Sequence, residues 1–324
     1  MQILISGSLA YDRIMDFPGQ FKDHILPDKI HILNVCFTVN GLTEKFGGTA
    51  GNIAYSLALL GERPMILATA GKDFDSYRRW LRRHELPLEG IVSIPEEFTA
   101  SAYITTDKRD NQITGFNPGA MKFPSRYPLD GLKAGQAMAI VSPGNLDDML
   151  GYSRKYKASG IAYICDPGQS IPALSPEQMA EFLIGAAVLI SNDYELEMIQ
   201  KKTGLDRKAL LGRVGAMITT LGEEGAEIRR GEEAIRIPAV PVSLVKDPTG
   251  AGDAFRAGLI KGMVDGKALE HGFYPRMEGI RFTLDERKKQ GLYLLEITAV
   301  QQSGVNSDPV EFWFYSGGNP GIGQ

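Results

Sequence analysis

Short apolar runs alternate with longer amphipathic stretches along most of this chain. Apolar runs of a few residues bounded by polar or turn residues are typical of buried strands, whereas apolar residues at helical spacing predict helices. The alternation predicts an α/β fold with a mostly parallel central sheet and helices on both of its faces. The predicted strands lie at 3–6, 65–69, 137–142, 161–166, 186–191 and 217–221, and the predicted helices at 51–61, 75–86, 148–160 and 175–185.

Two segments interrupt this alternation. Residues from about 13 to 46 and from about 98 to 116 contain alternating, β-prone stretches, IHILNVCFTV (30–39) and TASAYITTD (99–107), with no predicted helix between them. We expect these segments to form a small β lid over the edge of the sheet. Because the chain has neither an internal repeat nor a low-complexity linker, we predict one domain, residues 1–324, that carries this lid.

Composition and charge narrow the classes of partner. The 324 residues are 43% hydrophobic and 23% charged, as in ordinary globular proteins. Because 39 acidic residues outnumber 35 basic ones, the chain has no general attraction to nucleic acids or anionic membranes, and a small-molecule partner is favoured. Two distant cysteines, Cys36 and Cys165, indicate a reducing compartment, and the first apolar run is too short for a signal peptide or a membrane span. We therefore expect a cytoplasmic protein.

The stretch DPTGAGDAF (247–255) is the most specific chemical signal. Gly250, Ala251 and Gly252 expose their backbone N–H groups just before a predicted helix, which is a typical anion site. Asp253, next to them, has two possible explanations. The first is that it is an ordinary acidic residue at a helix N-terminus, where a negative charge is favourable. The small residues before it favour another explanation, in which the amides hold a phosphoryl group and Asp253 accepts a proton from an attacking alcohol. The GK[ST] ending of a Walker A loop is absent.

A second glycine stretch, EKFGGTAGN (44–52), precedes a predicted helix that ends near Gly61. Gly47 and Gly48 fit a plain tight turn as well as a ligand site. Asn52 on the first helical turn fits a hydroxylated ligand or a capping role.

These two stretches carry a family resemblance. FGGTAGN (46–52) and DPTGAGDAFRAG (247–258) are similar, in order and spacing, to the two signatures of the ribokinase-like, or PfkB, sugar and nucleoside kinases, with adenosine kinases of bacteria as the nearest group. The resemblance extends from residue 2 to about residue 266 and includes SGSLAYDRIMDFPGQF (6–21), GFNPGAM (115–121), DPGQS (166–170), SNDYELEMI (191–199) and TTLGEEG (219–225).

The resemblance implies a role for each matched position. Asp253 is the implied general base, and the amides of Gly250, Ala251 and Gly252 form the implied anion hole for the transferred phosphoryl group. The implied acceptor residues are Ser8, Asp12, Gly48 and Asn52 at the ribose and Phe37, Phe116 and Gln169 at the base. The implied ATP residues are Asn192, Thr220, Gly222 and Gly225, with Glu195 holding Mg²⁺ through water.

Several of these residues also have ordinary structural explanations. Asp12 could cap a turn, and Phe37 and Phe116 could be core residues. The stretch NDYE would form a capping box, in which Asn192 caps a helix and Glu195 bonds back to it. The four histidines have no metal-ligand spacing and are assigned no chemistry.

The implied activity is ATP- and Mg²⁺-dependent phosphorylation of the 5′-hydroxyl of adenosine to AMP, a purine-salvage reaction. Two alternatives remain open: the same chemistry on ribose or another sugar, and nucleoside binding with impaired turnover. A monovalent cation such as K⁺ and a homodimer formed through the lid are compatible with the resemblance.

The chain departs from the family pattern at two places. Cys36 and Ala102 stand where a serine and an aromatic residue are expected, which loosens the enclosure of the base. Residues 267–324 do not align with the two apolar helices expected to wall the adenine of ATP, so this tail is either a replacement or the product of a reading-frame change. We expect the tail to pack less regularly than the rest, and ATP to be bound weakly with little preference over GTP.

Overall fold

The computed structural model describes residues 1–239 and 250–266, together with the backbone of three strands between residues 280 and 315. A nine-stranded sheet forms the body, in the order β13-β12-β11-β10-β9-β8-β1-β4-β5, and neighbouring strands pair in parallel except at one edge, where β12 pairs antiparallel with both β11 and β13. The strands are β1 (Gln2–Ser6), β4 (Met65–Gly71), β5 (Ile91–Ile94), β8 (Ala137–Val141), β9 (Ala162–Cys165), β10 (Val188–Asn192), β11 (Ala216–Thr220), β12 (Ala226–Arg230) and β13 (Glu233–Ile237).

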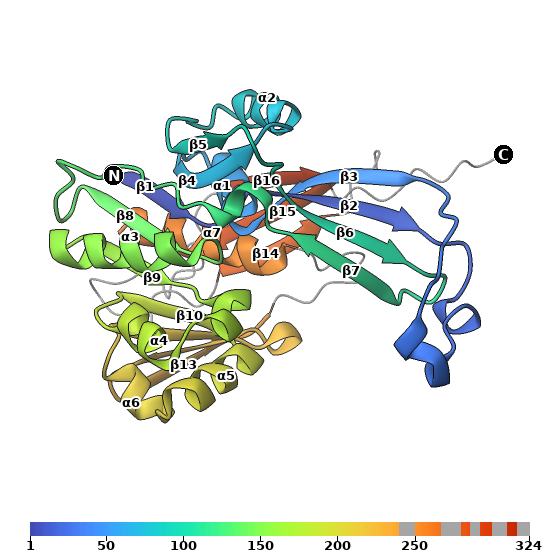
Figure 1. Ribbon diagram of the computed structural model, residues 1–324. Helices are drawn as coiled ribbons and strands as arrows, with labels where there is room; N and C mark the ends of the chain where they lie inside the picture. The colour runs from blue at the N-terminus through green and yellow to red at the C-terminus, as the bar shows by residue number, and fades with distance from the viewer. Residues whose placement is uncertain (240–249, 267–279, 286–291, 300–309, 316–324) are drawn as a thin grey trace.

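Helices cover both faces of this sheet, as predicted (Figure 1). Alternate strand residues point to opposite faces, so Ile5 packs with α1, α2 and α7, whereas Leu4 packs with α3 to α6. The predicted α/β fold is therefore confirmed, with two apolar cores, one on each face. The helices are α1 (Thr49–Leu59), α2 (Asp75–Arg83), α3 (Leu146–Ser159), α4 (Pro176–Leu183), α5 (Asp193–Thr203), α6 (Arg207–Leu211) and α7 (Ala251–Val264).

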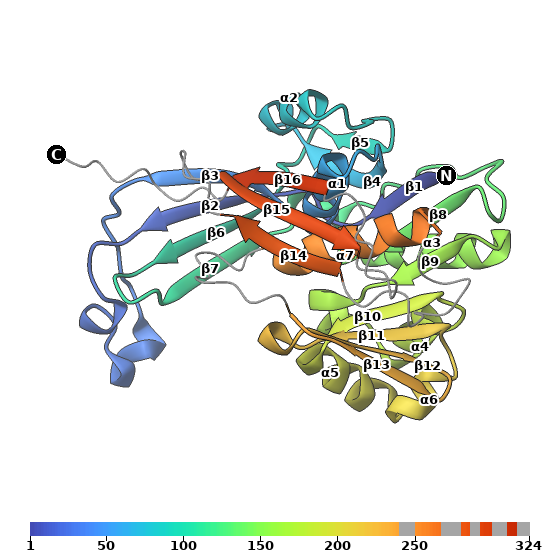
Figure 2. The same cartoon turned by 180° about the vertical axis from the view of Figure 1, so that it is seen from behind.

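A separate four-stranded sheet projects from the body in both views (Figures 1 and 2). Its strands are ordered β3-β2-β6-β7, with β2 and β6 parallel and the outer pairs antiparallel. Its position and its origin in two distant segments match the expected lid. We call this sheet the lid; its strands are β2 (Ala10–Asp16), β3 (Leu42–Gly47), β6 (Ala100–Thr106) and β7 (Gln112–Asn117).

One predicted lid strand is wrong. The stretch 99–107 forms β6, but 30–39 forms no strand: Pro27–Ile32 is a 3₁₀ helix, and 33–39 has no regular structure. The Phe37 ring instead packs at centroid distances of 4.8 and 5.0 Å against Phe17 and Phe21, near His24. This aromatic cluster organises the segment in place of strand pairing.

The C-terminal strands form a third, antiparallel sheet in the order β14-β15-β16, comprising β14 (Ile280–Asp285), β15 (Leu292–Ala299) and β16 (Val310–Tyr315). The other residues after Gly266, and residues 240–249 with the start of the DPTGAGDAF stretch, lie outside the described residues. The expectation about an adenine wall therefore stays a prediction.

Candidate active site

The predicted site residues of the body gather at one edge of the large sheet. Ser8 follows β1, Gln169 follows β9 and is exposed, and Asn192 and Thr220 end the paired strands β10 and β11. The carboxyl edge of a parallel sheet is where α/β proteins bind ligands, because loops and helix N-termini converge there.

The N-terminus of α7 is open toward this edge. Gly250 precedes the helix with φ of +80°, a left-handed conformation that glycine adopts without strain, and within the described part of the chain no side chain caps the helix. The first N–H group used inside the helix is that of Ala254, which donates to the Gly250 carbonyl at 2.9 Å. The preceding amides of Ala251, Gly252 and Asp253 have no partner within the helix itself, and their contact with a phosphoryl group stays a prediction.

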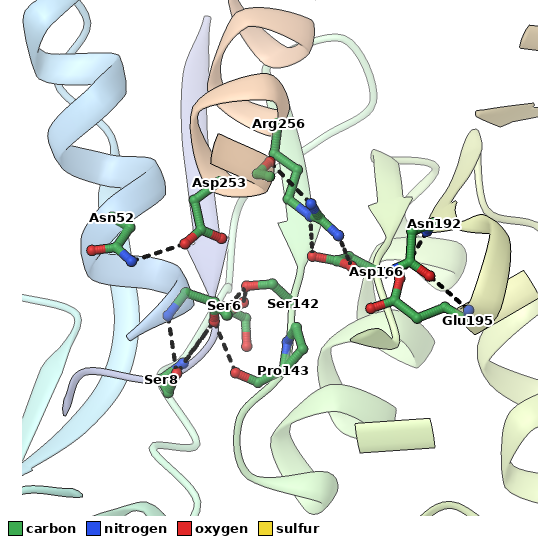
Figure 3. Close-up of polar contacts among 12 residues, drawn as sticks. Ser6, Ser8, Asn52, Ser142, Pro143, Asp166, Asn192, Glu195, Asp253 and Arg256 are labelled. Carbon is green, nitrogen blue, oxygen red and sulfur yellow. Dashed lines mark hydrogen bonds and ion pairs between the residues drawn. The ribbon is translucent and has the colours of Figure 1, made fainter. Parts of the chain in front are cut away.

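Asp253, on the first turn of α7, contacts α1 directly. The amide Nδ2 of Asn52 donates to Oδ2 of Asp253 at 2.8 Å (Figure 3). The two glycine-rich stretches, about 200 residues apart, therefore meet at one carboxylate. Asn52 was expected on the acceptor side and Asp253 on the phosphoryl side, and their contact places the two sides next to each other.

The environment of Asp253 suits a proton acceptor. Burial raises the pKa of Asp253 to about 6, while the hydrogen bond from Asn52 and the charge of Arg256 lower it and the charge of Asp166 raises it. A carboxylate with a pKa near 6 is ionised at neutral pH and is a stronger base than an ordinary aspartate.

Arg256, one turn later on α7, forms a buried bidentate ion pair with Asp166 at the end of β9. Nε lies 2.5 Å from Oδ2 and Nη2 lies 2.7 Å from Oδ1 of Asp166. Burial alone would lower the pKa of Arg256, but Asp166 outweighs it, so the pKa lies above its usual value. The positively charged guanidinium of Arg256 therefore lies next to Asp253, bonded to Asp166 (Figure 3).

The N-terminus of α1 is built from tightly packed backbone. Gly48 has φ of +89°, and a Cβ there would lie 2.5 Å from the Ser8 carbonyl oxygen. The Ser8 hydroxyl is buried and accepts from the N–H of Thr49 at 3.0 Å. In the structure Ser8 and Gly48 thus shape this turn, and contact of either with a ribose stays a prediction.

One face of the lid carries the predicted acceptor residues. Asp12 on β2 lies opposite Lys45 on β3 and Ala102 on β6, and Ala102 lies opposite Phe116 on β7. Directly opposed residues share a face, so Asp12, Ala102 and Phe116 lie in one row. Phe116 is 50% exposed, whereas Phe37 belongs to the aromatic cluster around Phe17.

The predicted nucleotide residues lie at β10 and β11. Asn192 and Glu195 form the capping box of α5: Asn192 Oδ1 accepts from the Glu195 N–H at 2.7 Å, and Glu195 Oε2 accepts from the Asn192 N–H at 2.9 Å. Thr220 lies opposite Asn192, and Gly222 and Gly225 begin and follow the adjoining 3₁₀ turn. The structural explanation of NDYE is therefore present, and a role of Glu195 at Mg²⁺ stays a prediction.

Among the described residues no group of three His, Cys, Asp or Glu side chains could hold a metal ion. The described helices include none that is long and apolar enough to cross a membrane.

Comparison with known proteins identifies the family. The model of the pfkB family of carbohydrate kinases matches residues 22–273. The chain belongs to the pfkB kinase family. This kinase is 31% identical to a nucleoside kinase of Methanocaldococcus jannaschii over 239 residues, which cover 73% of this chain and 78% of that protein.

Solved structures agree with this assignment. Burkholderia thailandensis nucleoside kinase in complex with inosine is 39% identical with a TM-score of 0.71, covering 82% of this kinase and 84% of that chain. The M. jannaschii nucleoside kinase structure has a TM-score of 0.74 at 29% identity, covering 83% and 87%. This pfkB-family kinase is therefore an ATP-dependent phosphotransferase with an alcohol acceptor, of the nucleoside or sugar kinase type.

Sequence analysis assigned no role to Asp166, Arg256 or Tyr77. All three lie close to the site of this pfkB-family kinase: Tyr77 donates to the Gly47 carbonyl at 2.8 Å, and its pKa is raised by burial and by the charges of Asp12 and Asp253. Asp166 could have been noticed as a charged residue that directly follows a buried strand. Its partner could not, because Arg256 is 90 residues away in the chain.

Proposed function

We propose that this kinase transfers the γ-phosphoryl group of ATP to the 5′-hydroxyl of a purine nucleoside, with adenosine as acceptor and AMP as product. The observation that carries the proposal is the Asn52–Asp253 hydrogen bond beside the uncapped amides of α7. It joins a proton acceptor, an anion site and α1, the helix that follows lid strand β3, at one place.

The reaction follows from this arrangement. Asp253 accepts the proton of the 5′-hydroxyl while that oxygen forms a bond to the γ-phosphorus, and the bond from the γ-phosphorus to the β,γ-bridging oxygen breaks to release ADP. The amides of Gly250, Ala251 and Gly252 donate to the phosphoryl oxygens, whose negative charge they stabilise. Mg²⁺, held through water by Glu195 and organised by Asn192, supplies positive charge to the phosphates when it is bound.

The lid supplies the selectivity for a nucleoside over a free sugar. Asp12 is suited to accept from two vicinal ribose hydroxyls, and a flat base next to the small side chain of Ala102 would lie within reach of the Phe116 ring. Gln169 offers both an amide donor and a carbonyl acceptor to the edge of the base.

Inosine is a second candidate acceptor. The B. thailandensis nucleoside kinase structure, 39% identical to this chain, contains inosine. Adenine and hypoxanthine differ in the hydrogen-bonding groups of their six-membered ring, and a glutamine amide pairs with either by turning over.

The proposal is tested by ATP consumption measured with adenosine, inosine, ribose and fructose as acceptors. We expect adenosine to exceed ribose by at least about 100-fold in kcat/KM, because a missing stacked and hydrogen-bonded base costs several kcal/mol. Equal or better activity on ribose or fructose would show a sugar kinase. Binding of adenosine without ATP consumption would show a nucleoside-binding protein.

A further inference from the structure

The Arg256–Asp166 ion pair joins α7 to the end of β9, and the proposed reaction depends on the relative position of these two elements. Arg256 lies on the first turns of α7, and Asp166 lies just after β9. Their side chains are only 12% and 1% exposed. Burying two charges costs free energy, and removing one partner of a buried pair costs stability. An ion pair in this position therefore calls for a structural or functional explanation.

Each guanidinium nitrogen of Arg256 donates a hydrogen bond to a protein oxygen. Arg256 uses Nε and Nη2 for Asp166, and its Nη1 donates to the Gly252 carbonyl at 2.9 Å. Both carboxylate oxygens of Asp166 accept from this one guanidinium. All three guanidinium nitrogens thus donate within the protein, which favours a role in fixing the backbone over one in gripping phosphate.

Gly252 fits this arrangement closely. A Cβ on Gly252 would lie 2.9 Å from Nη1 of Arg256, so a larger residue would displace the guanidinium. The structure therefore explains why residue 252 is a glycine: its lack of a side chain lets Arg256 bond back to the turn that carries the amides.

We propose that Arg256 and Asp166 act as a positioning pair for phosphoryl transfer, which fixes the turn from Gly250 to Asp253 against β9. This inference rests on the proposed role of Asp253 as the proton acceptor. Neither residue is a catalytic residue in this account, because each acts through the turn and through the carboxylate.

The charges around Asp253 allow a sharp test. The positive charge of Arg256 lowers the pKa of Asp253, and the negative charge of Asp166 raises it. Removal of Arg256 leaves Asp166 unpaired, and removal of the Asp166 charge leaves Arg256 unpaired, so the two changes push the pKa in opposite directions. The other polar or ionisable groups facing this region are Asn52 of α1, Tyr77 of α2, Asp12 of β2 and, toward Arg256, Glu195 of α5.

The experiment measures kcat/KM for adenosine against pH in Arg256→Gln, Asp166→Asn, Arg256→Lys and the double variant Arg256→Gln with Asp166→Asn. We expect the acid limb of the profile to move to higher pH in Arg256→Gln, to lower pH in Asp166→Asn, and back near its original position in the double variant. Arg256→Lys keeps the positive charge, so the acid limb should stay at its original pH. A lysine cannot bond both oxygens of Asp166 as arginine does, so turnover on the plateau should fall by about 10- to 100-fold.

Arg154→Gln is the matched control, because Arg154 forms a bidentate pair with Glu181 on α3 and α4, away from the site. It should leave the pH profile unchanged. A shift of both single variants in the same direction, or a loss of thermal stability with no shift, would show a purely structural pair. If one of the two single variants does not fold, the position of the acid limb in the other is compared with its position in Arg256→Lys.

Failure of this inference differs from failure of the proposed function. If the unaltered protein consumes no ATP with adenosine, the proposed function is wrong. If it does and Asp253→Asn keeps its turnover, Asp253 is not the proton acceptor and the inference loses its premise while the function stands. If Asp253→Asn is inactive while the pair variants show no opposite shifts, only the positioning pair is wrong.

Discussion

The two sides of the site differ in how firmly they are held. On the phosphoryl side, a hydrogen bond of 2.8 Å ties Asp253 to Asn52 of α1, and the buried Arg256–Asp166 ion pair ties α7 to the end of β9. On the acceptor side, Phe116 stands half exposed on an edge strand of the lid, opposite the small Ala102. Phosphoryl transfer requires preorganised charge, whereas acceptor selection tolerates an open surface that closes on its ligand. This difference predicts losses of rate on one side and losses of affinity on the other.

The largest effect is expected at Asp253. Asp253→Asn keeps the shape and removes the proton acceptor, so kcat for adenosine should fall by about 10² to 10⁴. Steady-state ADP formation measures it. A fall of less than about tenfold would remove Asp253 from the chemistry.

The next effect separates the two lid phenylalanines. Phe116→Ala removes a ring that stacks on the base, so KM for adenosine should rise by roughly 5- to 150-fold, with activity on ribose unchanged. Phe37→Ala is the comparison, because Phe37 packs in the cluster with Phe17 and Phe21. It should lower thermal stability more than adenosine affinity. Equal KM effects of the two variants would contradict this division.

The pH dependence tests the buried carboxylate. Because burial raises the pKa of Asp253 to about 6, and the ionised form is the one that accepts a proton, kcat/KM should be level near neutral pH. Below pH 6 it should fall by about tenfold per pH unit. An acid limb near pH 4, where an ordinary aspartate titrates, would mean that Asp253 is hydrated and not tuned.

An effect on stability rather than on rate or affinity is expected at the turn that links lid and body. Gly48→Ala combines a positive φ with a Cβ 2.5 Å from the Ser8 carbonyl oxygen, so it should cost about 3 kcal/mol of stability or more. Gly61→Ala is the matched control, with φ of +81° and open space around the Cβ, and should cost about 1 kcal/mol. Equal losses in denaturant unfolding would show that the close approach at Gly48 has no energetic weight.

The sheet and the helix N-termini could be predicted from sequence because their signals are local. Apolar periodicity located every parallel strand between β1 and β11 except the short edge strand β5, and the glycines before Asn52 and Asp253 marked the two turns that meet at the site. The segment 30–39 was predicted wrongly because its alternation resembles a strand, whereas tertiary contacts of Phe37 decide its structure.

The Arg256–Asp166 pair could not be predicted for a different reason. Both residues lie in stretches that the family resemblance covers. Neither stretch, however, indicates that the charge of Arg256 pairs with that of Asp166. That pairing exists only once β9 and α7 are brought together by the sheet and its helices. Long-range pairs of this kind are set by topology, which local sequence patterns do not encode.

The most direct test of the account is calorimetric titration of adenosine into Asp253→Asn. The account assigns this carboxylate to the proton and assigns affinity to the lid, so the Kd should stay within about threefold of the unaltered protein, a change of less than about 0.7 kcal/mol, while turnover is lost. Loss of adenosine binding in parallel with turnover would instead make Asp253 a substrate-gripping or structural residue, and the division between the two sides of the site would be wrong.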